Sequence, residues 1–268
     1  MSLIEAIILG IVQGLTEFLP VSSSGHIEIF KVLMGVEIKE ALLLTVLLHL
    51  ATALSTMIIY RKDLIQIIGG CFSKDWNWEK RFSLAVIISM IPAALVGLFL
   101  EDAIEKLFSG NMVLVGCMLL LTAVILYFSD KAKRESTGQV SFPKAVILGI
   151  VQAIAVLPGI SRSGSTIGSA VLLGMDRSAA ARFSFIMVLP LILGASAKKL
   201  LEYNEVSSAA GAESLGSTVL IAGFLAAFFS GLIALKWMIA LVQRSQLKWF
   251  ALYCSIAGLI ALGSGLFS

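Results

Sequence analysis

Three ionisable residues lie within otherwise apolar stretches of the sequence, and their types suit the handling of a phosphorylated ligand. Glu17, His26 and Arg162 each fall in or beside a Pro–Ser–Gly cluster that interrupts such a stretch. A charge at membrane depth costs about 2.5–3.5 kcal/mol or more, so these residues are functional candidates. Gln13 and Glu17, spaced i, i+4, present their oxygens on one helical face and suit a hard divalent cation. A carboxylate paired with Arg162 only for packing is the alternative.

The second candidate feature is a pair of anion sites, one at each cluster. Arg162 carries a planar fork of N–H donors that matches phosphate oxygens. A helix is expected to begin after each cluster, and the unpaired N–H groups of such a helix start attract anions. The residues expected to bind there, besides Arg162, are Ser24, Gly25, Ser163 and Thr166. Together they favour a polyanion, most simply a diphosphate.

Ser23 and His26 are the candidates for the chemical step. A serine near a histidine and a carboxylate can act as a nucleophile, or the histidine can serve a water molecule or the leaving group. Serines at a helix start are also common caps, and this alternative stays open. The second histidine, His49, lies within a predicted span and its role is undecided. Glu28 is expected on a different helical face, in an exposed or entrance position.

The elements that must position these residues are membrane helices. Apolar residues make up 58% of the 268 residues, charged residues 14%, and the mean hydropathy is +0.97. Soluble domains average about 45–50% apolar and 25% charged, which excludes a soluble enzyme or a disordered chain. A net charge of +3 without a basic tract indicates no nucleic-acid partner. Three scattered cysteines indicate neither disulfides nor a thiolate metal site.

Long apolar stretches predict how the chain crosses the bilayer. A span of a ~30 Å hydrocarbon core needs about 20 residues. Six stretches qualify: 40–60, 82–101, 111–129, 178–200, 216–236 and 247–267. Regions 3–35 and 143–175 are instead split near the middle by Pro20–His26 and Pro158–Gly164. Irregular backbone at membrane depth requires protein or a wet cavity around it, so we expect two re-entrant helix hairpins.

The two interrupted regions are copies of one another. Ala6–Gln13 and Ala145–Gln152 match at seven of eight positions, and the serines and glycine of the breaks match at the same offset of 139. An odd number of spans between the hairpins inverts the second copy, so the hairpins should meet near the midplane. The predicted fold is an all-α integral membrane protein. It is a single domain, 1–268, in which two inverted repeats (about 1–130 and 131–268) form about six transmembrane helices plus two re-entrant hairpins.

Basic residues orient this arrangement. Twelve Lys and Arg residues fall on the side of the 61–81 and 130–144 loops, and five fall on the other side. The positive-inside rule therefore places these loops in the cytoplasm and both termini and the first hairpin outside. The N-terminus lacks a basic signal-peptide region, so no cleavage is expected.

The motifs at these breaks resemble those of the undecaprenyl-diphosphatase family, the bacitracin-resistance protein BacA family. One signature is (E/Q)-x-x-x-E followed by P-V-S-S-x-G-H, here Gln13 to Glu17 and Pro20 to His26. The other is P-G-x-S-R-S-x-x-T, here Pro158 to Thr166. The resemblance covers essentially the whole chain. It implies a multi-pass enzyme of the bacterial plasma (inner) membrane, with an active site that faces the periplasm or cell exterior.

The resemblance also implies an activity. Members remove the terminal phosphate of undecaprenyl diphosphate, giving undecaprenyl phosphate, the lipid carrier of cell-wall synthesis, with a divalent cation, Mg²⁺ or Ca²⁺. Carried over by position, the site comprises Gln13, Glu17, Ser23, His26, Ser161, Arg162 and Thr166. Gln at the first position of the acidic motif fits the family pattern but leaves one fewer negative charge for the metal.

The leading hypothesis is metal-assisted hydrolysis of a polyprenyl diphosphate. Glu17 with Gln13 holds the metal, Arg162 binds phosphate, and Ser23 attacks or positions water with His26 as acid or base. The alternatives are a membrane carrier or flippase for a polyprenyl phosphate headgroup, and a purely structural membrane protein. Type 2 phosphatidic-acid phosphatases also carry an S-G-H and an S-R element, but their mechanism needs a nucleophilic histidine shortly after the S-R element. No histidine follows Arg162, so this family is excluded. The expected partners are the lipid substrate and the bilayer, and a homodimer is left open.

Overall fold

The computed structural model describes residues 1–26, 42–100, 103–104, 107, 111–132, 138–210 and 216–267. Within these ranges the regular structure is helical, with no β-strand. The named helices are α1 (Leu3–Phe18), α3 (Leu42–Ile59), α4 (Arg61–Cys71), α5 (Trp78–Phe99), α7 (Met112–Lys131), α8 (Phe142–Ile154), α9 (Arg162–Leu172), α10 (Arg177–Met187), α11 (Leu189–Ala210), α12 (Ser217–Gln243) and α13 (Lys248–Phe267).

The helices confirm an all-α integral membrane protein. Five helical segments of the described chain are long and apolar enough to cross a bilayer: α5, α7, the α10–α11 segment Arg177–Glu202, α12 and α13. A sixth span is formed by α3 if it is counted together with α4, from which it is bent by 78°. This count agrees with the six predicted stretches.

One helix was not expected from the sequence. Residues 61–81 were interpreted as a loop, but the chain turns at Tyr60 and continues as α4. Ile65 and Ile68 on α4 and Phe72 at its C-cap are exposed, while Ile67 is buried. The helix was missed because charged and polar residues interrupt its apolar face, which lowers the hydropathy of the segment below that of a span.

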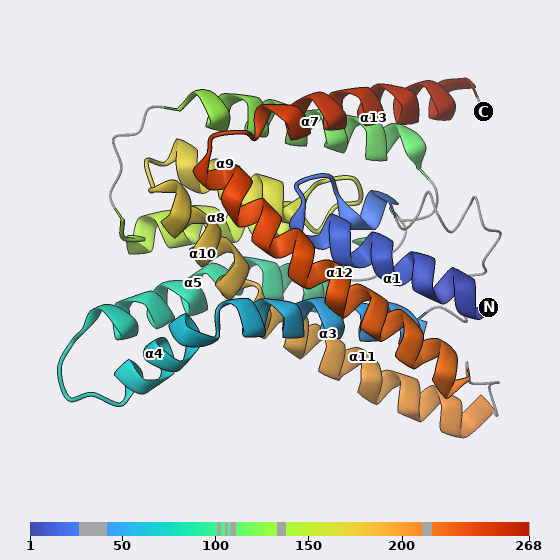
Figure 1. The fold of residues 1–268 in the computed structure, drawn as a ribbon, viewed down its shortest axis with the longest axis horizontal. Helices are drawn as coiled ribbons and strands as arrows, with labels where there is room; N and C mark the ends of the chain where they lie inside the picture. The colour runs from blue at the N-terminus through green and yellow to red at the C-terminus, as the bar shows by residue number, and fades with distance from the viewer. Residues whose placement is uncertain are drawn as a thin grey trace.

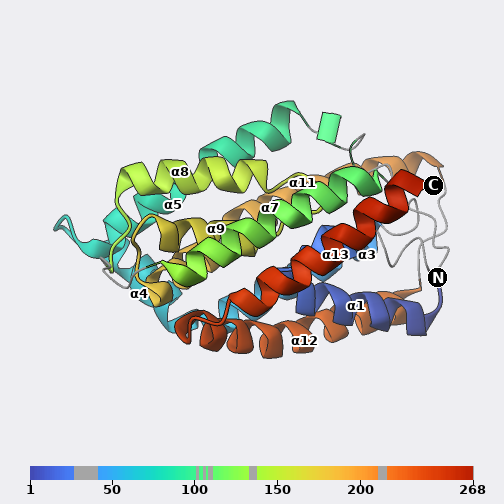
Figure 2. The same ribbon diagram turned by 90° about the horizontal axis from the view of Figure 1, so that it is seen from above.

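Two helix pairs each join one helix from the first half of the chain to one from the second half. Helix α1 packs along α12, and α8 packs along α5, while α7 and α13 lie side by side at one edge of the bundle (Figure 1). Helix α1 starts at the end that holds both termini, and α8 starts at the opposite end (Figure 2). The boundary between the two repeats near residue 130 stays a prediction.

The pairing of α8 with α5 depends on a close approach of the two backbones. A Cβ atom added at Gly149 would lie 2.6 Å from the carbonyl oxygen of Ser89 on α5. No side chain larger than hydrogen fits there without displacing the helix. A glycine therefore sets the depth at which α8, and the break that follows it, enters the bundle.

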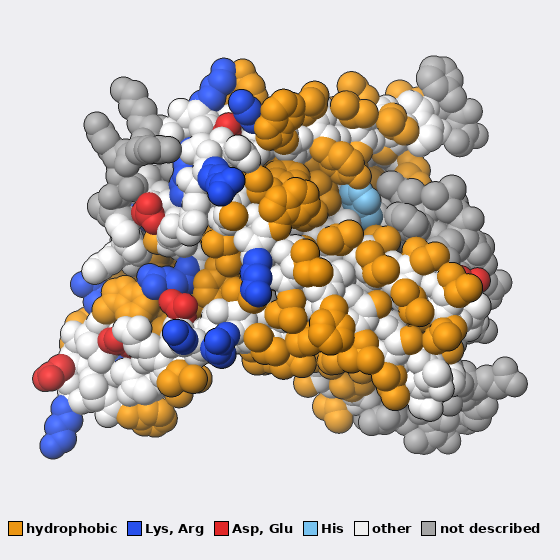
Figure 3. Space-filling model, viewed as in Figure 1, with side chains coloured by type: hydrophobic (Ala, Val, Ile, Leu, Met, Phe, Trp, Pro, Cys, Tyr) orange, Lys and Arg blue, Asp and Glu red, His pale blue; other side chains and the backbone are white. Residues whose placement is uncertain are grey.

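The surface agrees with a bilayer environment. Hydrophobic side chains cover the middle of one face, over α1, α12 and α13 (Figure 3). On the same face, Lys and Arg gather toward the end that holds α4 and α5. Exposed apolar side chains on this scale are stable only against lipid or protein.

Candidate active site at the two helix breaks

The two interrupted regions meet at the centre of the bundle. Helix α1 ends at Phe18 and helix resumes at Ser23, whereas α8 ends at Ile154 and α9 begins at Arg162. The hydroxyl of Ser163 donates to the Leu19 carbonyl at 3.4 Å, which ties one break to the other. The meeting of the two breaks expected from the sequence is therefore observed. The second arm of the first hairpin beyond His26, and with it Glu28, lies outside the described residues.

Both breaks restart their helices with the same serine cap. Ser22 Oγ accepts a hydrogen bond from the backbone N–H of Gly25 at 3.2 Å. Ser161 Oγ accepts one from Gly164 at 3.1 Å, and in each break the cap hydroxyl lies 3.3 Å from the serine hydroxyl two residues later. Ser22 and Ser161 are therefore the helix caps, and the hydroxyls of Ser24 and Ser163 lie beside them.

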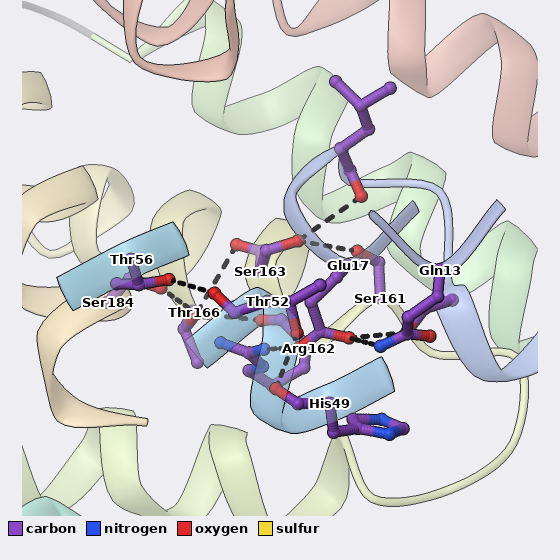
Figure 4. A network of polar contacts seen from close by, with 12 residues as sticks. Gln13, Glu17, His49, Thr52, Thr56, Ser161, Arg162, Ser163, Thr166 and Ser184 are labelled. Atoms are coloured by element: carbon purple, nitrogen blue, oxygen red, sulfur yellow. Dashed lines mark hydrogen bonds and ion pairs between the residues drawn. The ribbon is translucent and has the colours of Figure 1, made fainter. Parts of the chain in front are cut away.

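Glu17 is the centre of the polar network between the breaks (Figure 4). Its Oε1 accepts from Nη2 of Arg162 in an ion pair. Its Oε2 accepts from the Gln13 amide and from the Ser23 hydroxyl, each at 3.1 Å. Gln13 is fully buried and Glu17 is 7% exposed. The arrangement brings one carboxylate, one guanidinium, one amide and one hydroxyl together at a site screened from water.

Two buried atoms of this network have no hydrogen-bond partner among the described residues. They are Nη1 of Arg162, a donor, and Oε1 of Gln13, an acceptor. Buried polar atoms without partners are costly and uncommon in folded proteins. One fits a negatively charged oxygen and the other fits a cation, and both belong to side chains that contact Glu17.

The oxygens of Glu17 and Gln13 fit a single hard cation only if water and substrate phosphates complete its coordination. The described residues contain no cluster of three or more His, Cys, Asp or Glu side chains. Mg²⁺ typically takes one or two carboxylates from the protein and fills its shell with water and substrate phosphates. Glu17 and the unpartnered amide oxygen of Gln13 meet that requirement.

His26 lies at the edge of the network and contacts α13. Its Nδ1 is 2.8 Å from the Ser22 carbonyl oxygen, and its Nε2 is 2.5 Å from the Tyr253 hydroxyl. The sequence hypothesis paired His26 with Ser23. In the described structure the group in contact with the Ser23 hydroxyl is the Glu17 carboxylate.

Thr166 is engaged inside the protein. Its hydroxyl donates to the Arg162 carbonyl oxygen at 2.8 Å and accepts from Ser184 at 2.5 Å. Thr166 is fully buried and Ser184 is 1% exposed. This pair ties the first turn of α9, which carries Arg162, to α10.

A polar stripe on α3 lines the same network and was not singled out from the sequence. Thr52 and Thr56 are buried and lie beside Arg162 and Ser184 (Figure 4). His49 lies on the same helix, with its Nδ1 2.8 Å from the Thr45 carbonyl. His49, Thr52 and Thr56 are spaced i, i+3, i+7, which places them on one face of an apolar span. This spacing could have indicated the stripe from the sequence.

Helices α7 and α13 close the site from one side. Thr122 of α7 accepts from the Ser161 backbone N–H at 3.1 Å, and Cys254 of α13 donates to the Pro20 carbonyl at 3.2 Å. Gly159 has a φ of 92°, and a Cβ there would lie 2.6 Å from the Val115 carbonyl. No other residue could make this turn so close to α7 without strain.

Comparison with known proteins identifies the family. A model of the family described as "Bacitracin resistance protein BacA" matches residues 6–260, which include both breaks. The chain belongs to the BacA family. Three relatives named undecaprenyl-diphosphatase align with this BacA chain over nearly their whole length. That of Christiangramia forsetii is 53% identical over 264 residues, 98% of each chain. Those of Parabacteroides distasonis and Bacteroides fragilis are each 46% identical, over 98% and 96% of each chain.

Proposed function

We propose that this chain is an undecaprenyl-diphosphate phosphatase. It hydrolyses undecaprenyl diphosphate to undecaprenyl phosphate and inorganic phosphate, which returns the lipid carrier to cell-wall synthesis and confers resistance to bacitracin. The family membership supports the substrate. The observation that carries the proposal is the buried Glu17 network with its two unpartnered atoms of opposite character.

Arg162 is the proposed ligand of the terminal phosphate. Its Nη2 is occupied by Glu17, whereas Nη1 is buried and free to donate to a phosphate oxygen. Arg162 is the first residue of α9, so the positive end of the helix dipole adds to the attraction for the anion. Ser24, Gly25, Ser161, Ser163 and Thr166 are proposed to shape this site through the caps and the Ser184 contact.

Ser23 and Glu17 are proposed to carry out the transfer. The Ser23 hydroxyl already donates to Glu17 Oε2, so the carboxylate can take its proton, or that of a water oriented in the same place. The new oxygen–phosphorus bond forms at the terminal phosphorus, and its bond to the bridging oxygen breaks. Undecaprenyl phosphate leaves with the electron pair, and if Ser23 is the nucleophile, water then hydrolyses the phosphoserine.

A divalent cation, Mg²⁺ or Ca²⁺, is proposed to bind Glu17 and Gln13 together with the diphosphate. When bound, it would neutralise the charge that develops on the phosphate oxygens. Gln13 contributes a neutral oxygen, so the protein offers one negative charge to this cation. The amide N–H of Gln13 meanwhile orients Glu17 through its 3.1 Å hydrogen bond.

The proposed location is the bacterial inner membrane, with the site open to the periplasm. This orientation rests on the gathering of Lys and Arg at the α4–α5 end of the molecule and on the two termini at the other end (Figures 2 and 3). The substrate's polyprenyl chain would remain in the bilayer. A homodimer stays a prediction.

The direct test is phosphate release by the purified protein in proteoliposomes that contain undecaprenyl diphosphate. We expect one inorganic phosphate per undecaprenyl phosphate formed, loss of release with EDTA, and recovery with Mg²⁺ or Ca²⁺. Arg162→Ala should reduce release by more than about 100-fold. A wild-type protein that releases no phosphate, while the Christiangramia forsetii relative does so in the same vesicles, would refute the proposal.

A headgroup carrier is the second candidate, since α1 and α8 start from opposite ends of the molecule (Figure 2). Interrupted helices that meet from opposite sides are typical of transporters. Transfer of undecaprenyl phosphate between leaflets without phosphate release would favour this function over hydrolysis.

A further inference from the structure

The imidazole of His26 is held at both ring nitrogens by groups that the proposed reaction does not use. Nδ1 lies 2.8 Å from the Ser22 carbonyl oxygen, and Nε2 lies 2.5 Å from the hydroxyl of Tyr253, which comes from α13, 227 residues further along the chain. The two rings are also stacked, with centroids 5.7 Å apart and planes inclined by 17°. Three contacts therefore fix both the position and the plane of this ring.

These contacts determine where the imidazole carries its proton. A carbonyl oxygen only accepts hydrogen bonds, so Nδ1 must carry a hydrogen to contact Ser22. In the neutral ring the lone pair then lies on Nε2, and the Tyr253 hydroxyl donates to it. Nε2 is thus the one ring nitrogen that can take up a proton during a reaction, and because its single lone pair faces Tyr253, that proton passes through the Tyr253 hydroxyl.

The backbone at Ser22 adapts to this arrangement. Ser22 has a φ of 73°, which is uncommon for a residue other than glycine, and its side chain is 1% exposed. Its carbonyl oxygen accepts from both the backbone N–H of His26, at 3.2 Å, and the imidazole Nδ1. A left-handed serine at a functional site is a place where local strain is retained for geometry.

Cys254, the residue after Tyr253, fixes helix α13 to the same break. Cys254 donates to the Pro20 carbonyl at 3.2 Å and is fully buried, so Tyr253 is positioned relative to the break that carries His26. Tyr253 itself is 44% exposed. The position of the Tyr253 hydroxyl therefore depends on how α13 is held, and not on burial of the Tyr253 ring.

We propose that Tyr253 is a positioning residue for the phosphatase reaction. The Ser22 carbonyl keeps Nδ1 protonated, and the Tyr253 hydroxyl donates to Nε2. The ring therefore exchanges a proton with water or with a phosphate oxygen at the first break through this hydroxyl, which gives its proton to Nε2 as it takes up another. The proposal rests on the proposed function for its role in turnover. The contact itself can be tested without turnover.

The first measurement compares Tyr253→Phe with wild type and with Tyr127→Phe. Tyr127, on α7, is 46% exposed and its hydroxyl contacts Lys131, so it controls for loss of a half-exposed tyrosine hydroxyl. We expect Tyr253→Phe to lower kcat about tenfold with KM changed less than about twofold. Tyr127→Phe should match wild type in both constants.

The second measurement reads the tautomer directly. The chain contains two histidines, so ¹⁵N-histidine labelling gives two sets of ring signals, and His26→Gln assigns them. Wild type should show an unprotonated Nε2 for His26. Tyr253→Phe should shift this Nε2 signal, because its lone pair loses the hydroxyl that donates to it, whereas Tyr127→Phe should leave the signal in place.

A double-variant comparison separates positioning from a general structural effect. If Tyr253 acts through His26, Tyr253→Phe should cause no further loss of kcat in a His26→Gln background. An unchanged His26 spectrum and kcat in Tyr253→Phe, or an equal loss in both backgrounds, would overturn the proposal. A wild type without phosphate release would refute the proposed function alone, because the spectra would still decide whether Tyr253 holds the ring.

Discussion

Replacement of Arg162 by lysine tests whether both halves of the guanidinium are needed. Nη2 of Arg162 pairs with Glu17, while Nη1 is buried without a partner among the described residues. A lysine ammonium is a single point charge and cannot reach the carboxylate and a phosphate oxygen from one planar fork. Arg162→Lys therefore keeps the charge and removes one of the two directed contacts.

The size of the loss follows from the contact that is removed. A hydrogen bond to a charged group contributes about 1.5–3 kcal/mol. Since about 1.4 kcal/mol corresponds to a factor of ten, kcat/KM should fall about 10- to 150-fold. The assay is phosphate release from undecaprenyl diphosphate in detergent micelles, measured over a range of lipid concentrations at saturating Mg²⁺.

A matched substitution at Arg182 controls for the change of side chain. Arg182 pairs with Asp63 at 3.2 Å, and both side chains are about one-third exposed. Pairs of this kind contribute about 0–1 kcal/mol, so Arg182→Lys should leave kcat/KM within about twofold of wild type. A value for Arg162→Lys within about threefold of wild type would refute the assignment of Nη1 to the substrate.

Three further substitutions test the cation site and the packing around it. Gln13→Glu adds a second carboxylate, so the Mg²⁺ concentration for half-maximal phosphate release should fall about tenfold; an unchanged requirement would remove Gln13 from the site. Thr166→Val leaves the buried Ser184 hydroxyl without its partner and should lower the free energy of unfolding by about 1–3 kcal/mol, measured as a fall in Tm. Gly149→Ala forces α8 away from α5 and should cost about 1–3 kcal/mol, whereas Gly69→Ala, with open space around it, should leave Tm unchanged or raise it.

The interruptions of the helices could be predicted because their cause is local. Proline and glycine beside Ser22 and Ser161 end one helix, and the serines cap the next, so each half is too short to span a bilayer. The repeated offset then indicated that the two breaks belong together. Local chemistry and the repeated sequence were sufficient to predict that Glu17 and Arg162 lie close together, as they do.

The partners supplied by distant helices could not be predicted in the same way. Tyr253, Thr122 and Ser184 each contact a break from the interior of an apolar helix. Hydropathy places such residues in a span, but it does not say which neighbour they face. The bend at Tyr60 was missed for a related reason, since a change of direction between two helices leaves little trace in composition.

The asymmetry of a site that lies between two repeated sequence segments has a physical reason. Ser23 and Arg162 are 139 positions apart, so they occupy equivalent places in the two copies, and both contact Glu17, on different oxygens. Arginine at both places would bring two buried cations to one carboxylate, and serine at both would leave that carboxylate unpaired. The two repeated segments provide two serine-capped helix starts, and the site requires that the first residue of each helix differ.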